Sequence, residues 1–238
     1  MEFKTSISKV SKDGLVLRGE KLIDLMEDNF SDVIFFTLLG RKPSSVESKI
    51  FSAMLISVVD HGMGTTSSLT SRFVMSGGNS MNTAVGAGVL ALGDYHGGAI
   101  EKAMGQYLGI EDVVKFVKEN KIIFGFGHKV YKNFDPRVKE LLKLCNKLGY
   151  KSKYINLVLD IEKEIKKVCL NVDGFIAAVL LEMGFNSELG KGVFIIGRVV
   201  GLVAQAYEEK LKEKPVRRID EESIEYTGDL KFNKKIKR

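Results

Sequence analysis

The chain has 238 residues, 45% of them hydrophobic and 28% charged, which excludes a disordered or fibrous protein and predicts one or two globular domains. Its formal net charge is +6, but residues 230–238 hold five basic residues and no acidic one, so most of the excess lies in a C-terminal tail. Because nucleic-acid binding needs basic residues gathered on a folded face, we expect no nucleic-acid partner.

The cysteines and the hydropathy of the chain predict its cellular compartment and whether it spans a membrane. Cys145 and Cys169 form no Cys-x-x-Cys pair, and no basic-then-apolar leader opens the chain, which predicts a reduced, cytoplasmic protein. Within the uncharged stretch of residues 73–92, only residues 84–92 are continuously small or apolar. That is much shorter than the roughly 20 residues that span a bilayer, so we expect no membrane span.

The pattern along the chain predicts a mainly α fold. Residues 5–18 favour a hairpin turning at Asp13-Gly14, and Ser44-x-x-Glu47 and Asp135-Pro136 are typical of helix starts. The small residues of 81–93 indicate a helix that lets a neighbouring backbone come close. Its Gly86-x-Gly88 has neither a third glycine nor a preceding strand, so a dinucleotide loop is not expected. Further helices are predicted at residues 20–29, 32–39, 44–60, 111–120, 135–149, 157–168, 174–183 and 193–212.

Three histidines are present, and each stands beside a glycine: His61, His96 and His128. A histidine is often a satisfied core or surface residue, but glycine neighbours remove side chains and let a ligand approach the imidazole. The spacings of 35 and 32 residues lack the pattern of a local metal site, so we expect no metal.

Three charged residues complete the candidate chemistry. Asp173 stands at a predicted helix start, where capping alone would also explain it. Arg198 is the only charge in the apolar run 193–206, and Arg137 lies near the start of the helix that follows Asp135. A carboxylate with a neutral histidine suits proton transfer next to a thioester, and arginines suit a dicarboxylate.

At these residues the sequence resembles the citrate synthase superfamily. The resemblance rests on Gly93-Asp94-Tyr95-His96-Gly97-Gly98, Gly125-Phe126-Gly127-His128-Lys129-Val130-Tyr131-Lys132, Asp135-Pro136-Arg137, Asn171-Val172-Asp173 and Gly197-Arg198, in the family's order. It implies an abbreviated citrate-synthase-like fold. A large helical domain would comprise residues 1–97 and 184–238, and a smaller inserted helical domain residues 98–183, with the active site in the cleft.

Departures from citrate synthases point to a cleaving relative. The chain is shorter, the missing stretch falls between Pro43 and Asp60, and the Glu-Leu-Asn that commonly follows the equivalent of His61 is absent. In these respects it is similar to citryl-CoA lyase and to the citrate-synthase-like part of ATP-citrate lyase. We therefore expect cleavage of citryl-CoA to acetyl-CoA and oxaloacetate. The alternatives are a compact citrate synthase and a non-catalytic acyl-CoA-binding subunit.

The resemblance also implies residue roles. His128 would bind the tertiary hydroxyl of citryl-CoA and take its proton, His96 would stabilise the acetyl-CoA enolate, and Asp173 would return a proton to the methyl carbon. The oxaloacetate carboxylates would bind His61, Arg137 and Arg198, and the CoA phosphates would meet Lys129, Lys132 or Arg72. CoA would enter as part of the substrate, with no tightly bound cofactor. The resemblance also implies a homo-oligomer, at least a dimer, in which Arg217 or Arg218 crosses to the neighbouring site. A citryl-CoA synthetase is a further implied partner.

Overall fold

The computed structural model describes residues 2–12 and 14–228, so the predicted basic tail lies outside the described residues. The chain opens with an antiparallel sheet in the order β1 (Ser8–Ser11), β2 (Gly14–Leu17) and β3 (Glu20–Lys21). The predicted hairpin is confirmed, with Gly14 at φ +114° where it leaves the turn. The helix predicted over residues 20–29 is wrong at both ends, because residues 20–21 pair with β2 and only α1 (Leu22–Leu25) is helical.

Most of the rest of the described chain is helical, which confirms the mainly α prediction. Ser44 and Glu47 form the predicted capping box, and Asp135 caps the helix after it through the backbone N–H of Arg137. Two helices that the sequence pattern did not predict are α4 and α6. The helices are α2 (Phe30–Leu39), α3 (Ser45–Ser57), α4 (Thr66–Ser76), α5 (Met81–Leu90), α6 (Ala99–Tyr107), α7 (Val113–Glu119), α8 (Pro136–Lys147), α9 (Lys153–Ile165), α10 (Val172–Glu182) and α11 (Gly190–Lys212).

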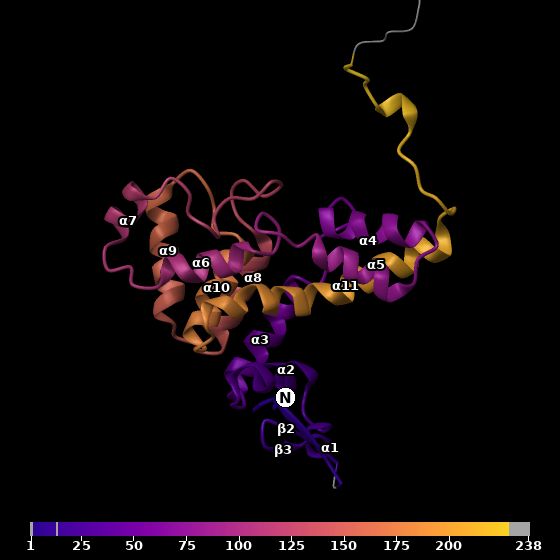
Figure 1. The fold of residues 1–238 in the computed structure, drawn as a ribbon. Helices are drawn as coiled ribbons and strands as arrows, with labels where there is room; N and C mark the ends of the chain where they lie inside the picture. The colour runs from indigo at the N-terminus through magenta and orange to yellow at the C-terminus, as the bar shows by residue number, and fades with distance from the viewer. Residues whose placement is uncertain (1, 13, 229–238) are drawn as a thin grey trace, which may run out of the picture.

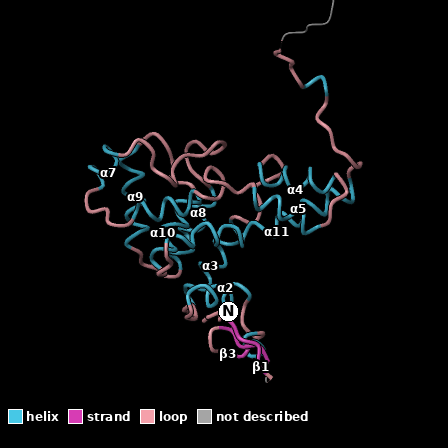
Figure 2. Tube along the Cα trace, in the orientation of Figure 1, coloured by secondary structure: helices cyan, strands magenta, loops and turns pink. Residues whose placement is uncertain are grey.

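Helix α11 runs through the middle of the molecule and joins its parts (Figure 1). It packs on α4 and α5 towards its C-terminal end, on α6 towards its N-terminal end, and also on α3. Helices α6 to α10 form one helical group, and the strands lie apart from it beyond α2 (Figure 2). The division into two domains at residues 97/98 and 183/184 stays a prediction.

The central helix is also the only described segment that is long and apolar enough to cross a membrane, at residues 187–212. Its Arg198 and Glu209 side chains are buried in the fold, and it contacts four other helices. We therefore interpret it as the core helix of a folded domain. The close approach predicted for residues 81–93 is seen at Gly88, where a Cβ atom would meet Leu202 of α11 and the Ser67 carbonyl of α4 at 3.1 Å.

Candidate active site

A cavity of about 550 Å³ brings together residues that are far apart in the sequence. Its walls come from the loop before α4, the loop before α6, the loop before α8, the start of α10 and the middle of α11. Seven of the nine predicted site residues line it: His61, His96, His128, Lys129, Arg137, Asp173 and Arg198.

The loop that carries His128 is fixed to the start of α10 by a contact between two glycines. Gly125 has φ +88°, and a Cβ atom placed on it would overlap the backbone of Gly174. Around this contact, Asn171 receives the Gly174 N–H at its side-chain oxygen and donates from Nδ2 to the Gly127 carbonyl at 2.7 Å. The Asn171 backbone N–H also reaches the Gly125 carbonyl, at 2.9 Å. His128 and Asp173 are thereby held at a set separation.

Replacing Gly125 with Ala should therefore both destabilise the fold and lower activity. The methyl group would overlap backbone that cannot rotate away, and the residue would carry a left-handed φ, so we expect a loss of about 3 kcal/mol in unfolding free energy. Gly149→Ala is the matched control, since Gly149 also has a positive φ but open space around it, and should cost only about 1 kcal/mol. Urea unfolding of both variants measures the difference, and equal losses would show that the glycine contact does not matter.

The hydrogen bonds of His128 fix its tautomer. Both the Val130 and Tyr131 backbone N–H groups donate to Nδ1 at 3.1 Å, so the neutral ring carries its proton on Nε2. The Arg137 Nη2 atom lies 3.4 Å from that Nε2, which leaves two donors facing the same space. An oxygen acceptor between them would satisfy both. Because Nε2 already carries a proton, His128 is suited to donate a hydrogen bond to a substrate oxygen. This differs from the role implied by the family resemblance, in which His128 takes the hydroxyl proton.

Asp135 positions Arg137 and is more than a helix cap. Its side chain is fully buried, and it accepts hydrogen bonds from Arg137 Nε at 3.0 Å and Nη2 at 2.8 Å. It also accepts the Val172 backbone N–H at 3.0 Å, which ties the start of α8 to the start of α10. The Arg137 guanidinium and these hydrogen bonds hold the pKa of Asp135 below its usual value despite its burial.

His96 and Arg198 are each anchored through one nitrogen. His96 Nε2 lies 2.8 Å from the hydroxyl of the buried Ser67 on α4, which leaves Nδ1 without a partner among the described residues. Arg198 donates from Nε to the Val58 carbonyl at 2.8 Å, and its Nη1 is buried without a hydrogen-bond partner in the described part of the chain. A buried guanidinium nitrogen of this kind calls for an anionic or carbonyl oxygen.

The pocket shifts the titration of its acid and its histidines. Desolvation raises the pKa of Asp173 to about 6, against the opposing effect of Arg137 and Arg198. Desolvation, followed by the nearby arginines, lowers the pKa of His61, His96 and His128 below their usual values. At neutral pH the site therefore offers neutral histidines and a carboxyl group that can take up and release a proton.

Two residues expected to meet the CoA phosphates lie outside the cavity. Lys132 is exposed and donates to the His128 carbonyl at 3.1 Å. Arg72 is only 4% exposed, because it is buried between α4 and α11 and forms an ion pair with Glu209 at 2.7 Å. The expectation that Arg72 contacts CoA is therefore wrong, and its role is to join two helices.

Arg72→Ala should consequently change stability and not coenzyme binding. Removing the buried guanidinium takes away its hydrogen bonds to Glu209 and Gln205 and leaves Arg217 as the remaining cation beside Glu209, so we expect a loss of about 2 kcal/mol in unfolding free energy. Circular dichroism during urea unfolding measures the loss, and calorimetric titration with CoA provides the second reading. A weaker affinity for CoA at unchanged stability would return Arg72 to the site.

Sequence reasoning missed two residues here. Ser67, which orients His96, lies in a run of serines and threonines whose pattern predicts no role. Asp135 was assigned only as a helix cap, and its bond to Val172 could not be read from the sequence because the partner is 37 residues away.

Comparisons with known proteins agree on a family. Residues 19–219 match the family model described as citrate synthase, C-terminal domain. Citrate synthase 2 of Bacillus subtilis is 30% identical over 229 residues, which cover 90% of this chain and 60% of that protein. The citrate synthase of Helicobacter pylori is 34% identical over 214 residues, or 80% of this chain and 49% of that protein. The chain thus spans about half to three-fifths of the length of these curated relatives.

Solved structures include one that corresponds over nearly its whole length. The citryl-CoA lyase from Hydrogenobacter thermophilus is 44% identical with a TM-score of 0.92, covering 97% of this chain and 96% of that one. The ATP citrate lyase of Methanosaeta concilii shares the fold, at 23% identity and a TM-score of 0.86, over 97% of this chain and 42% of that one. A Thermoplasma acidophilum citrate synthase, solved with carboxymethyl coenzyme A and oxaloacetate, has a TM-score of 0.72 at 26% identity over 87% and 59%.

Proposed function

Because the chain belongs to the citrate synthase family, we propose that it is a citryl-CoA lyase, which cleaves citryl-CoA to acetyl-CoA and oxaloacetate. The observation that carries the proposal is the end-to-end correspondence with the Hydrogenobacter thermophilus citryl-CoA lyase. The substrate would come from a citryl-CoA synthetase, which joins citrate to CoA.

Oxaloacetate would bind among the arginines. The Arg198 Nη1 atom, buried without a partner among the described residues, would receive one carboxylate, and His61 would lie beside it. The space between Arg137 Nη2 and His128 Nε2 would hold a second substrate oxygen, which is either a carboxylate oxygen or the hydroxyl oxygen. These donors are fixed before the substrate arrives, which favours stabilisation of developing negative charge.

Because neutral His128 carries its proton on Nε2, we propose that a single carboxyl group performs both proton transfers. Ionised Asp173 would accept the hydroxyl proton while His128 and Arg137 donate to that oxygen. The carbon–carbon bond then breaks, the oxygen becomes the keto group of oxaloacetate, and the electron pair passes into the acetyl-CoA enolate. His96 Nδ1–H would hold the enolate oxygen. Asp173 would then return its proton to the methylene carbon of the enolate, which becomes the methyl group of acetyl-CoA. This carbon is within reach because it and the hydroxyl oxygen were both bonded to the central carbon of citryl-CoA.

A product-resolved assay tests this function against the alternative. Given citryl-CoA, the protein should release oxaloacetate, measured with malate dehydrogenase, faster than free CoA, measured with a thiol reagent. Citrate formation additionally needs a water positioned on the thioester carbonyl, whereas cleavage needs only the groups already named. Predominant citrate and free CoA would make the protein a compact citrate synthase, which the names of its sequence relatives favour. No turnover in either assay would leave the acyl-CoA-binding subunit.

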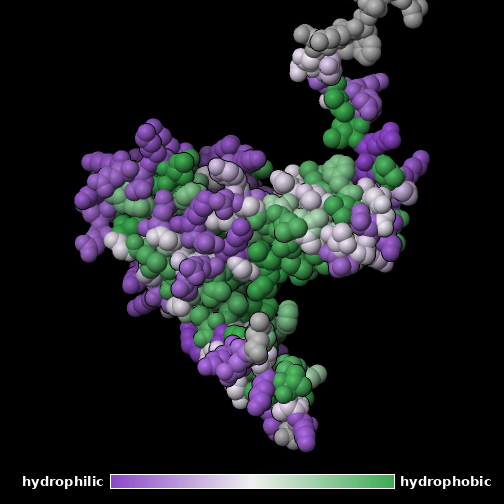
Figure 3. Space-filling model, viewed as in Figure 1, coloured by the Kyte–Doolittle hydropathy of each residue, from purple (hydrophilic) through white to green (hydrophobic). Residues whose placement is uncertain are grey.

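A second chain would complete the site. Residues after α11 extend away from the body of the molecule (Figure 1). Among them, Ile219, Ile224 and Tyr226 are exposed. Figure 3 shows apolar surface near the middle of the molecule. On α11, Val200 and Val203 are exposed. We expect these surfaces to meet a second copy in a homo-oligomer.

The contacts at the start of the C-terminal arm, residues 213–228, favour one of the two candidate arginines for the neighbouring site. Arg217 is tied to Glu209 of its own chain at 2.6 Å, and the Val216 N–H donates to the Ser76 carbonyl at 2.8 Å. Arg218 is exposed and has no ion pair among the described residues, so we expect Arg218 to cross to the neighbouring site.

Mixing two inactive variants tests the crossing. Arg218→Ala and Asp173→Asn subunits should each be nearly inactive, but a mixed dimer would contain one site with both Asp173 and the partner's arginine. We expect up to about half of the activity per mixed dimer to return after subunits are exchanged and measured by oxaloacetate release. Arg217→Ala mixed in the same way is the control, and failure of the Arg218→Ala mixture to recover would place Arg218 outside the partner's site.

A further inference from the structure

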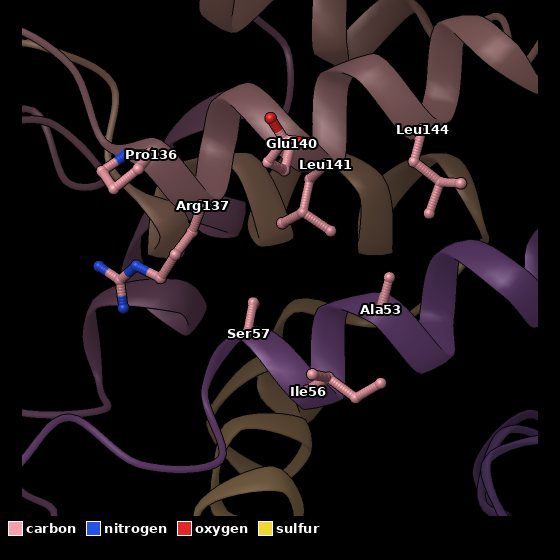
Figure 4. A pocket seen from close by; sticks show the side chains of 8 residues that line it. All are labelled: Ala53, Ile56, Ser57, Pro136, Arg137, Glu140, Leu141 and Leu144. Atoms are coloured by element: carbon pink, nitrogen blue, oxygen red, sulfur yellow. The ribbon is translucent and has the colours of Figure 1, made fainter.

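A second cavity, of about 460 Å³, lies between α3 and α8 and is separate in its walls from the candidate active site except at one residue. Figure 4 shows Ala53, Ile56 and Ser57 of α3 facing Leu141 and Leu144 of α8. We call this cavity the α3–α8 groove. Pro136, Arg137 and Glu140 complete its lining. Its volume is in the range of small-ligand sites, and its walls are almost entirely carbon.

The polar groups that line the groove differ in whether they can still form a hydrogen bond with a ligand. The Ser57 hydroxyl donates to the Met54 carbonyl at 2.7 Å, so it is already used. Glu140 is exposed and lies 3.5 Å from Lys143. Arg137 gives Nε and Nη2 to Asp135, while its Nη1 has no hydrogen-bond partner among the described residues. The groove therefore combines apolar walls with one cation at its end that can still donate.

Arg137 is the one residue that lines both cavities. In Figure 4 its side chain leaves α8 beside Pro136 and carries the guanidinium past the end of the groove. The same guanidinium lies 3.4 Å from His128 in the candidate active site. A ligand in the groove would thus contact the arm of a residue that faces the reaction.

We propose that the α3–α8 groove binds an aliphatic monocarboxylate of medium chain length. Its hydrocarbon chain lies between α3 and α8, and its carboxylate binds the Arg137 guanidinium. The Arg137 Nη1 donor at one end and the apolar walls favour this class over neutral ligands, and the Glu140 carboxylate of the same lining disfavours dianions. A consequence that rests on the proposed function is that this ligand competes with oxaloacetate for Arg137.

The affinity of the groove should depend on the length of the ligand's hydrocarbon chain. Each methylene transferred from water to an apolar site favours binding by an amount that corresponds to about a threefold to fourfold gain in affinity. The affinity should rise from butanoate through hexanoate to octanoate, and level off once the groove is full. Octan-1-ol has a chain of the same length without the charge, so it should bind at least tenfold more weakly than octanoate.

Calorimetric titration of the full chain with these four compounds is the test. Ala53→Phe fills the groove and should weaken octanoate at least tenfold, while Lys49→Phe, at an exposed position of the same helix, should not. Ile56→Glu is the second variant, since Ile56 is 68% exposed and tolerates a polar group, and its carboxylate should repel octanoate more than octan-1-ol. Equal binding of the acid and the alcohol, or unchanged binding to both groove variants, would overturn the proposal.

Two further readings separate this proposal from the proposed function. Oxaloacetate is titrated into the wild-type protein and into Ala53→Phe, with and without octanoate. We expect octanoate to weaken oxaloacetate at least threefold in the wild type and to have no effect in Ala53→Phe. If octanoate binds but oxaloacetate does not, the groove site stands and the proposed function falls. A change of oligomeric state on adding octanoate, seen by sedimentation velocity, would instead make the groove a subunit contact and overturn the small-ligand site.

Discussion

Asp173→Asn should lower the rate of citryl-CoA cleavage by about 10²-fold or more, because it removes the group that accepts and returns the proton. The amide keeps the size of the side chain at the start of α10, so binding of oxaloacetate should survive. Oxaloacetate release gives the rate, and calorimetric titration gives the affinity. Asp160→Asn, an exposed substitution on α9, is the control and should leave the rate unchanged. Near-normal turnover in Asp173→Asn would reduce Asp173 to a helix-start residue.

The same variant should be more stable than the wild type, but only at high pH. Desolvation raises the pKa of Asp173 from 3.8 to about 6, so the folded state binds the proton more tightly than the unfolded state. The associated stability is therefore fully present below pH 3.8 and is lost as pH rises through about 6. At pH 8 Asp173→Asn should gain on the order of 3 kcal/mol over the wild type, and the gain should disappear by pH 4. Urea unfolding at both pH values measures it, and a pH-independent difference would contradict the assignment.

His96→Ala should lower turnover by about 10²- to 10³-fold, because it removes the preorganised donor for the enolate oxygen. The dicarboxylate groups, Arg137 and Arg198, lie on other elements and keep their own anchors, so the affinity for oxaloacetate should change little. Rates of oxaloacetate release and calorimetric titration give the two values. Equal losses in rate and in oxaloacetate affinity would show that His96 holds the dicarboxylate instead.

Ser67→Ala separates orientation of His96 from its chemistry. Without the hydroxyl at 2.8 Å, Nε2 loses its hydrogen-bond partner, and the ring loses the contact that fixes its orientation. We expect an intermediate loss of about tenfold, on the scale of one hydrogen bond of about 1.4 kcal/mol. In the double variant with His96→Ala, Ser67→Ala should add no further loss, since its effect passes through the ring.

Local signals predicted the fold well where the controlling groups are neighbours in sequence. The capping box of Ser44 and Glu47 and the Asp135-Pro136 start each involve residues within one turn, so their patterns are legible. Helix α4 was missed because its buried residues are Ser67, Ser68, Ser71 and Arg72, with Met75 as its one buried large apolar side chain. Periodicity of apolar residues cannot reveal a helix that buries hydroxyl groups and an ion pair.

The sequence predicted which residues belong to the candidate site better than it predicted the contacts among them. Glycine neighbours and the resemblance to the citrate synthase superfamily drew attention to His61, His96 and His128, which the structure brings to one cavity. The tautomer of His128 depends on backbone N–H groups two and three residues on, so no sequence pattern carries it. Arg72 was misjudged because its partner Glu209 is 137 residues away.

The contact between Gly125 and Gly174 also determines how this protein can be made more heat-resistant. Exchanging glycine for alanine is a common stabilising substitution, since it narrows the unfolded ensemble. At these two positions it would drive His128 and Asp173 apart. Gly105 and Gly192 are in helices and have open space for a methyl group, so alanine there should raise the melting temperature without touching the cavity. A thermostabilised variant is therefore best sought on α6 and α11, with the glycine pair left as it is.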